Sequence, residues 1–334
     1  MKLLITGGAG FMGSNFIHHI LEKYPDYSVI NLDKLTYSGN LDNLKDLEGN
    51  SRYRFVEGDI CDATLINSLT VDVDVIVNYA AETHVDRSIL APLDFVRTDV
   101  MGTQTLLEAV RKNKVKKMVQ ISTDEVFGSI EDGKFTEESP FEPNSPYAAS
   151  KAGGDLLCRA YHVTYDVPVI VTHSCNFFGP YHYPEKFIPL AITNLLTGKK
   201  VPVYGDGNQV REWIYTKDHC SAVDATLHKG KIGEVYNIST EDERKNIDVI
   251  QLLLQILGKD ESSIEYVTDR PGHDRRYAID SSKLRNDLGW DPEYKFEDAL
   301  VKTVTWFQNN ESWWKKIIET TDYQAYFKKQ YPTL

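Results

Sequence analysis

A tyrosine and a lysine four residues apart are the first side chains in this sequence that could carry out chemistry together. Tyr147 and Lys151 form the only Tyr-x-x-x-Lys of the chain, and this spacing puts both on one face of a helix. The ammonium could lower the pKa of the phenol and hold the ribose of a nicotinamide cofactor, so that Tyr147 serves as the base in an alcohol oxidation. The hydroxyl of Thr123, 24 residues earlier, could share the substrate oxygen.

Two adjacent acids, Asp124 and Glu125, follow Thr123 directly at the expected end of a strand. If both face one pocket, their repulsion raises the pKa of one carboxyl and supplies an acid and a base near neutral pH. An elimination of water requires such a pair. The alternative is an acidic loop that faces solvent.

A glycine-rich segment, GGAGFMG at residues 7–13, follows the first expected strand. Gly7 permits a tight turn, Gly10 lets a pyrophosphate approach the backbone, and Gly13 allows close packing of helix on strand. The helix that begins here points its N-terminus at the phosphates. The GxxGxxG spacing is typical of the extended short-chain dehydrogenases, although a glycine turn alone can also be purely structural.

Acidic and small residues at later strand ends extend this interpretation. Asp33 lies 20 residues after Gly13, where a carboxylate accepts hydrogen bonds from the adenosine ribose and repels the 2′-phosphate of NADP. Asp59 could reach the adenine amino group, and Ala80 and Ala81 leave room beside the cofactor. We therefore expect NAD.

The elements that must position these residues alternate along the first half of the chain. Expected strands are 2–6, 28–32, 53–57, 74–78, 117–122 and 167–172, and expected helices are 12–23, 94–112 and 147–165. This alternation predicts an α/β fold, a Rossmann-type doubly wound parallel sheet with helices on both faces. We expect an NAD-binding domain over 1–173 and a smaller α/β substrate-binding lobe over 174–334, with the chain crossing between them. We expect segment 296–316 to form one helix that packs on the core through its apolar and tryptophan side chains.

Composition narrows the class of protein. The formal charge of −12 argues against a broad nucleic-acid surface, and no apolar run approaches the roughly 18 residues that a membrane helix requires. The four cysteines form no CxxC pair, so we expect reduced thiols and no metal. The chain enters its glycine loop without a signal-peptide pattern, and we expect a cytoplasmic protein.

Motifs spread over essentially the whole chain make the sequence similar to the dTDP-glucose 4,6-dehydratases. They are TGGAGFMGSNF, DKLTYSGNL, AAETHVDRSI, STDEVFGS, SPYAASKA, FGPYHYPEKFIPL, VYGDGNQVREWIYTKDHC, GEVYNIS and DRPGHDRRYAID. The TDE triplet at 123–125 is the specific part, because related sugar epimerases generally carry small residues after the hydroxyl.

The resemblance implies a mechanism. Tyr147 takes the C4 hydroxyl proton while NAD accepts the C4 hydride, Glu125 removes the C5 proton, and Asp124 protonates the departing C6 hydroxyl. The hydride then returns to C6, which leaves a 4-keto-6-deoxy sugar and regenerates a tightly held NAD.

Two sets of binding residues follow from the motifs and the resemblance. The expected cofactor set is Gly7, Gly10, Phe11, Met12, Gly13, Asp33, Lys34, Leu35, Thr36, Asp59, Ile60, Ala80, Ala81, Thr98, Tyr147 and Lys151. The expected substrate set is Thr83, Thr123, Asn176, Lys186, Phe187, Pro202, Tyr204, Arg211, Asn246, Arg270 and His273. Pro202 and Tyr204 would border the base, and the arginines suit a diphosphate because they bind it bidentately.

The resemblance also implies a homodimer, in which helices 94–112 and 147–165 form a four-helix bundle with a second copy. Several positions depart from the family pattern. Thr83 replaces a serine, and Asp99 stands where asparagine is common. The stretch 173–179 is less polar than the family pattern, and Phe177 cannot supply the side-chain amide expected there.

Alternatives stay open at this point. A UDP-, CDP- or GDP-sugar dehydratase differs only in the nucleotide, which the sequence does not fix. A UDP-sugar 4-epimerase does not need Asp124 and Glu125, and a non-catalytic NAD-binding protein does not need Tyr147 and Lys151.

Overall fold

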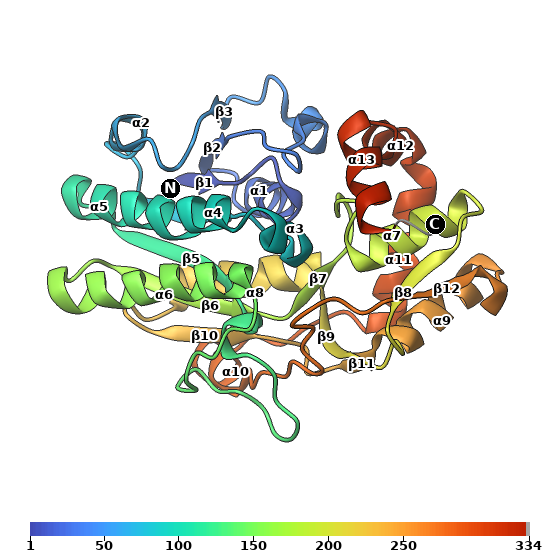
Figure 1. Cartoon of the computed structure of the whole chain (residues 1–334). Helices are drawn as coiled ribbons and strands as arrows, with labels where there is room; N and C mark the ends of the chain where they lie inside the picture. Colours follow the sequence, from blue (N-terminus) through green and yellow to red (C-terminus); the bar gives the residue numbers. More distant parts are fainter. Residues whose placement is uncertain (332–334) are drawn as a thin grey trace.

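A seven-stranded parallel sheet forms the larger part of the molecule, with strand order β10-β6-β5-β4-β1-β2-β3. The computed structural model describes residues 1–331 (Figure 1). The strands are β1 (Lys2–Thr6), β2 (Ser28–Asp33), β3 (Tyr53–Glu57), β4 (Val75–Asn78), β5 (Lys117–Thr123), β6 (Val169–Ser174) and β10 (Val235–Ile238). The predicted Rossmann-type doubly wound sheet is confirmed. Only the sixth strand is displaced noticeably, because it begins after Pro168 rather than at Val167.

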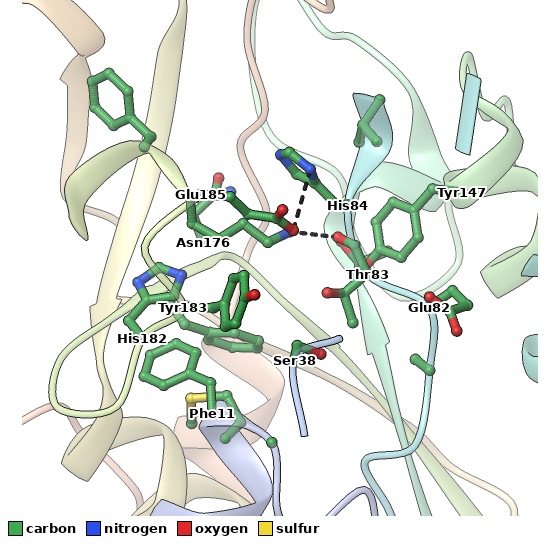
Figure 2. A pocket seen from close by; sticks show the side chains of 18 of the residues that line it. Phe11, Ser38, Glu82, Thr83, His84, Tyr147, Asn176, His182, Tyr183 and Glu185 are labelled. Atoms are coloured by element: carbon green, nitrogen blue, oxygen red, sulfur yellow. Dashed lines mark hydrogen bonds and ion pairs between the residues drawn. The ribbon is translucent and has the colours of Figure 1, made fainter. Parts of the chain in front are cut away.

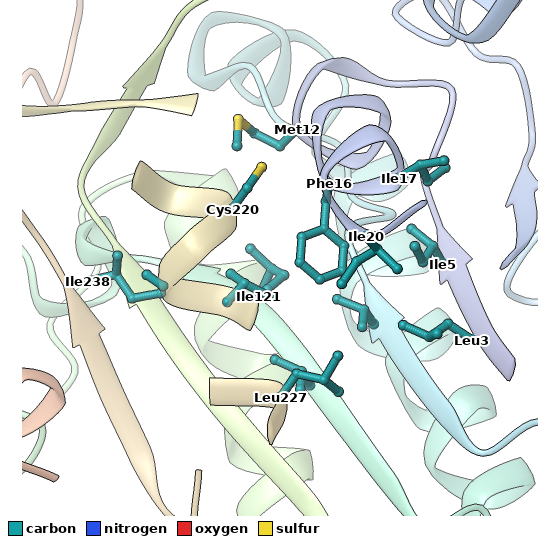
Figure 3. Close-up of a cluster of buried hydrophobic side chains, with 14 of the residues drawn as sticks. Leu3, Ile5, Met12, Phe16, Ile17, Ile20, Ile121, Cys220, Leu227 and Ile238 are labelled. Atoms are coloured by element: carbon teal, nitrogen blue, oxygen red, sulfur yellow. The ribbon is translucent and has the colours of Figure 1, made fainter. Parts of the chain in front are cut away.

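Helices cover both faces of this sheet, and together they form the sheet lobe. One face carries α1 (Phe11–Lys23) and α8 (Thr216–Lys229), which pack on each other, and the other carries α2 (Ala63–Leu69), α5 (Thr103–Asn113) and α6 (Pro146–Tyr165). Successive strand residues point to opposite faces, so Leu3 and Ile5 join the α1–α8 cluster of Figure 3, whereas Leu4 joins the cluster under α5 and α6. Fully buried strands of this kind need no polar face.

The helix predicted over 94–112 is irregular. It consists of α4 (Pro92–Phe95), a π-helical segment Val96–Gly102 and α5. Close packing accompanies the irregular turn: a Cβ on Gly102 would lie 2.3 Å from Ile60, and one on Gly154 would lie 2.8 Å from the Asp99 carbonyl oxygen. The turn leaves the Asp99 side chain buried.

A second group of elements, the small lobe, lies beside the sheet lobe (Figure 1). Its strands pair as β11-β9-β7 and β12-β8. Its elements are β7 (Asn176–Phe178), α7 (Phe187–Leu196), β8 (Val201–Tyr204), β9 (Val210–Tyr215), β11 (Glu243–Lys245), α9 (Asn246–Leu257), β12 (Ile264–Val267), α11 (Phe296–Asn309), α12 (Glu311–Ile318) and α13 (Thr321–Gln330). Between β9 and β11 the chain returns to the sheet lobe, where α8 packs on α1 and β10 pairs with β6. α10 (Ser282–Leu288) also packs there, and a division at residue 173 stays a prediction.

The prediction of a single helix over 296–316 is wrong. α11 ends at Asn309 and α12 begins at Glu311, because Asn310 leaves the helical conformation and its side-chain amide donates to the Trp306 carbonyl oxygen at 2.8 Å. The tryptophans do pack as expected, and Trp313 and Trp314 are buried in the small-lobe core. Over residues 1–331, no helix has both the length and the apolar character needed to cross a membrane.

Candidate active site

One large cavity, of about 360 Å³, opens at the carboxyl ends of the parallel strands, and residues of both lobes line it. Ligands of open α/β sheets bind at this edge, where the strand order reverses. Here the reversal lies between β1 and β4, and the backbone after these strands is so close that a Cβ on Gly7 would lie 2.6 Å from the Ala80 nitrogen.

The glycine loop fits a diphosphate. Gly7 has φ +68°, which a residue with a side chain rarely adopts, and a Cβ on Gly13 would lie 2.3 Å from the Gly7 carbonyl oxygen. α1 begins after Gly10 without a side-chain cap from the described residues, and its first turn lines the cavity. Unpaired N–H groups at such a helix start form an anion site.

Asp33 closes the opposite side of this loop. Its carboxylate accepts hydrogen bonds from the backbone nitrogens of Ala9 at 2.9 Å and Leu35 at 2.8 Å. Burial raises the pKa of Asp33, and these backbone donors oppose the rise. Lys34 pairs with Asp59 at 2.8 Å. The Asp33 carboxylate is therefore held beside the glycine loop, where it could accept hydrogen bonds from the ribose of NAD.

All the predicted cofactor residues except Leu35 line the cavity. Leu35 is not among the residues that line the cavity; it has φ 53°, and its backbone nitrogen donates to Asp33 Oδ1 at 2.8 Å. All the cofactor assignments, that of Leu35 included, stay predictions.

The TDE triplet turns at the end of β5. Thr123 ends the strand and caps a short 3-10 helix, Asp124–Phe127, because its hydroxyl accepts from the Glu125 nitrogen at 3.3 Å. The same hydroxyl donates to Asp124 Oδ1 at 3.2 Å. Asp124 Oδ2 is buried and has no hydrogen-bond partner within residues 1–331. All three side chains line the cavity.

The two acids have unequal surroundings. Burial raises the pKa of Asp124 well above its ordinary value, the negative charges of Glu125 and Glu212 raise it further, and only Arg211 and the Thr123 hydroxyl oppose them. Burial also raises the pKa of Glu125, but Arg270, Arg211 and Lys186 hold it down. Asp124 is thus the carboxyl more readily kept protonated, and Glu125 the one more readily ionised.

Tyr147 and Lys151 reach the cavity from the first turns of α6, which Ser145 caps by accepting from the Ala148 nitrogen at 3.1 Å. Figure 2 shows Tyr147 beside Thr83 on one side of the cavity. Burial and the charge of Glu125 raise the pKa of Tyr147 well above its ordinary value. The ammonium of Lys151 donates to the Ile121 carbonyl oxygen at 2.7 Å. The prediction that Lys151 lowers the pKa of the Tyr147 phenol is therefore not confirmed.

All the predicted substrate residues line the same cavity. Lys186 donates to the Thr83 carbonyl oxygen at 2.6 Å and so joins the two lobes. Arg211 is buried and donates to the Asp274 carbonyl oxygen at 2.9 Å, and Arg270 pairs with Asp86 at 3.1 Å. The wall thus holds three cations next to the acid pair.

Several lining residues escaped sequence reasoning although they lie inside the quoted motifs. Glu185 accepts from the Arg87 guanidinium at 2.7 Å, across 98 residues of chain. His182 stacks on Phe11 with ring centroids 4.1 Å apart, and Figure 2 shows the two rings next to each other. Burial and the Asp99 charge raise the pKa of Glu82 to about 7. The motifs containing them were the available signal, but no spacing rule singled these residues out.

The departures from the family pattern lie close to the cavity. Asp99 accepts from the Ser150 hydroxyl at 2.6 Å and the Glu82 nitrogen at 3.2 Å, and burial raises its pKa to about 6. Phe177 lines the cavity and packs edge-on against His219, with ring centroids 4.5 Å apart. Thr83 also lines the cavity.

Comparisons with known proteins agree with this geometry. The family described as GDP-mannose 4,6 dehydratase matches residues 4–303. A dTDP-glucose 4,6-dehydratase of Xanthomonas campestris is 49% identical, with 95% of each chain covered. The low-salt glycan biosynthesis protein Agl12 of Haloferax volcanii is 52% identical, with 92% of this chain and 98% of that protein covered. The crystal structure of the dTDP-glucose 4,6-dehydratase DesIV of Streptomyces venezuelae, with NAD bound, has a TM-score of 0.93 and 50% identity, covering 95% of this chain and 100% of that one.

The parallel sheet, the glycine loop and the Tyr147–Lys151 pair define an extended short-chain dehydrogenase/reductase fold. Within that class, the chain belongs to the dTDP-glucose 4,6-dehydratase family.

Proposed function

We propose that this chain is an NAD-dependent hydro-lyase that converts dTDP-glucose to dTDP-4-keto-6-deoxyglucose. One observation carries the proposal: Asp124 and Glu125 line the cavity that Tyr147 and Lys151 line, and their surroundings favour different protonation states. Relatives of similar length with this activity support the choice of substrate.

The side chains of the protein divide the proton transfers. Tyr147 accepts the proton of the sugar C4 hydroxyl, and the Thr123 hydroxyl holds the same oxygen. NAD, when bound, supplies the hydride acceptor for C4 and later the hydride donor for C6. Glu125 takes the C5 proton, which the C4 ketone has made acidic, while Asp124 gives its proton to the C6 oxygen, and water leaves. Glu125 then returns its proton to C5, which restores its ionised starting form. Asp124 regains, through solvent, the proton that Tyr147 took from the C4 hydroxyl.

The diphosphate is assigned to the cations of the wall. Arg211 and Arg270 present planar guanidinium groups that bind phosphate oxygens through charge-assisted hydrogen bonds, and Lys186 adds a point charge. All three already lie near Glu125, which their charges stabilise in the ionised form. In the proposed complex the sugar lies between the diphosphate and the acid pair.

We also propose a cytoplasmic homodimer. Residues of α4, the π-helical segment and α6 expose large apolar side chains, namely Leu93, Val96, Met101, Leu156 and Val163. Together they form a surface that a second copy could cover as a four-helix bundle. The four cysteines are free, as the reducing cytoplasm favours. Light scattering of the protein and its L156E variant tests the dimer, which should give way to a monomer in the variant.

The activity is tested by incubating the purified protein with dTDP-, UDP-, CDP- and GDP-glucose without added NAD. A 4-keto-6-deoxy sugar absorbs in strong base, whereas a 4-epimer does not, so the product separates a dehydratase from an epimerase. We expect product from dTDP-glucose. If the protein is shown to hold NAD and none of the four substrates reacts, the proposal is refuted.

A further inference from the structure

The last helix of the small lobe, α13, touches both lobes at the rim of the cavity. The Tyr323 hydroxyl donates to the Pro184 carbonyl oxygen at 3.1 Å. The Tyr326 hydroxyl meets His84 Nδ1 at 3.0 Å, and His84 follows β4 of the sheet lobe. Figure 1 shows α13 on the side of the small lobe that faces the sheet lobe. The helix therefore spans the opening between the lobes rather than covering a remote surface.

A cation fixes the middle of this helix. The Arg87 guanidinium lies between two rings, 3.7 Å from the centroid of Tyr37 and 4.3 Å from that of Tyr326. The same guanidinium binds Glu185 at 2.7 Å. Stacking on both faces and a bidentate acid leave the guanidinium little freedom. This anchor holds the middle of α13 and thereby sets where its C-terminal end lies.

That end reaches Tyr204. The Gln330 amide donates to the Tyr204 hydroxyl at 2.6 Å, and the Tyr331 hydroxyl lies 3.4 Å from the same oxygen. The rings of Tyr204 and Tyr331 lie with centroids 6.0 Å apart and an angle of 33°. Tyr331 is 7% exposed, and it lines the cavity.

The hydrogen bonds at Tyr204 leave the Tyr331 hydroxyl free to donate its proton elsewhere. A phenol has a single proton to donate. Tyr204 lies 3.3 Å from the Asp86 carboxylate, which also pairs with Arg270, and a charged acceptor takes that proton in preference to a neutral hydroxyl. Since Gln330 already donates to the Tyr204 oxygen, the Tyr331 hydroxyl can turn its own proton toward the cavity.

We propose that Gln330 and Tyr331 are specificity-determining residues, which fix Tyr204 and close the nucleotide-base end of the cavity. The inference rests on the proposed function, in which Tyr204 borders the base. Gln330 acts through Tyr204 and is a positioning residue, whereas Tyr331 forms the wall itself. Their hydrogen bonds go to Tyr204 and not to Asp124 or Glu125, so they govern binding of the nucleotide and leave the chemical steps unchanged.

The test compares Q330A, Y331A and Y331F with K329A, which alters an exposed side chain of the same helix. Affinity for dTDP is measured by calorimetry, and KM and kcat are measured with dTDP-glucose and UDP-glucose. We expect Q330A to weaken dTDP binding by up to about tenfold, as the loss of a half-buried hydrogen bond does, and Y331A on the order of tenfold or more. KM for dTDP-glucose should rise in parallel, kcat should stay within about twofold, and K329A should match the parent protein.

Retained NAD and an unchanged melting temperature show that a variant is folded. If Y331A loses either, Q330A and the ring-preserving Y331F still decide the matter. Unchanged dTDP affinity in both Q330A and Y331F, or a fall in kcat without a change in KM, overturns the inference. A parent protein that binds dTDP without converting dTDP-glucose refutes the proposed function alone, and the affinities of the variants still test the helix. A parent protein that binds no dTDP refutes both.

Discussion

Replacing Asp99 with asparagine should stabilise the protein, and more so at high pH than at low pH. Asp99 is 2% exposed, and its two acceptor contacts come from Ser150 and the Glu82 nitrogen. An asparagine can satisfy this site. Its oxygen can accept from the Glu82 nitrogen, and its amide can donate to the Ser150 oxygen. The Ser150 hydroxyl can then turn its single proton to the Tyr147 carbonyl oxygen, 2.8 Å away.

The size of the effect follows from the pKa of Asp99, which burial raises from 3.8 to about 6 although Lys151 opposes the rise. A carboxyl whose pKa is raised on folding favours the folded state at low pH, and this contribution is lost as pH rises through the folded value. The cost of ionisation reaches about 3 kcal/mol at pH 8 and about half of that at pH 5. D99N removes this cost, whereas any loss of hydrogen-bond strength is the same at both pH values.

Urea denaturation of the NAD-loaded parent protein and D99N at pH 5 and pH 8 measures the effect. The difference in free energy of unfolding between the two proteins should grow by about 1 kcal/mol or more from pH 5 to pH 8. D94N, which changes an exposed acid nearby, serves as the control and should show little change at either pH. A difference that is equal at both pH values, or larger at pH 5, would refute the reasoning.

Two further predictions concern the acids and the fold. D124N and E125Q should each slow keto-sugar formation on the order of 10²- to 10⁴-fold. The ultraviolet absorbance of reduced NAD should build up in both variants, because oxidation precedes elimination, whereas Y147F should abolish both signals. If no reduced NAD builds up in D124N, the role assigned to Asp124 is contradicted. D224A should lower the free energy of unfolding by about 2–4 kcal/mol, because the buried Asp224 binds Lys23 at 2.7 Å and Tyr24 at 2.9 Å and so joins α8 to α1. Urea denaturation measures this loss of stability, and an unchanged midpoint would contradict the prediction.

The sequence predicts the sheet lobe well because its signals are local. Buried strands and their following helices appear as short β-branched runs and periodic segments, so β1 and β3 have the expected bounds. The small lobe is different. β7 and β11 have three residues each, too few for a period, and they pair only through β9. No pattern in the chain marks such pairings, and α13 lies beyond the last predicted helix.

The same distinction applies to the site. Residues predicted from a fixed spacing, such as Gly7, Gly13 and Tyr147, do line the cavity, because one turn or one helix sets their geometry. Glu185 and Arg87 are not found, since their ion pair forms only when the two lobes meet. Leu35, which belongs to the DKLTYSGNL motif, does not line the cavity. Spacing thus predicts which segments meet, and packing decides which side chains face the ligand.

The acid pair and the expected diphosphate site are electrostatically one unit. Arg270, Arg211 and Lys186 hold down the pKa of Glu125, and in the proposed complex the same cations bind the diphosphate. A bound diphosphate offsets their charge, so the pKa of Glu125 rises and its carboxylate becomes a stronger base for the C5 proton. Asp124 depends less on these cations, because burial and the neighbouring acids raise its pKa and only Arg211 of the three is among the groups that lower it. Binding of the nucleotide therefore makes Glu125 a stronger base and leaves the pKa of Asp124 raised.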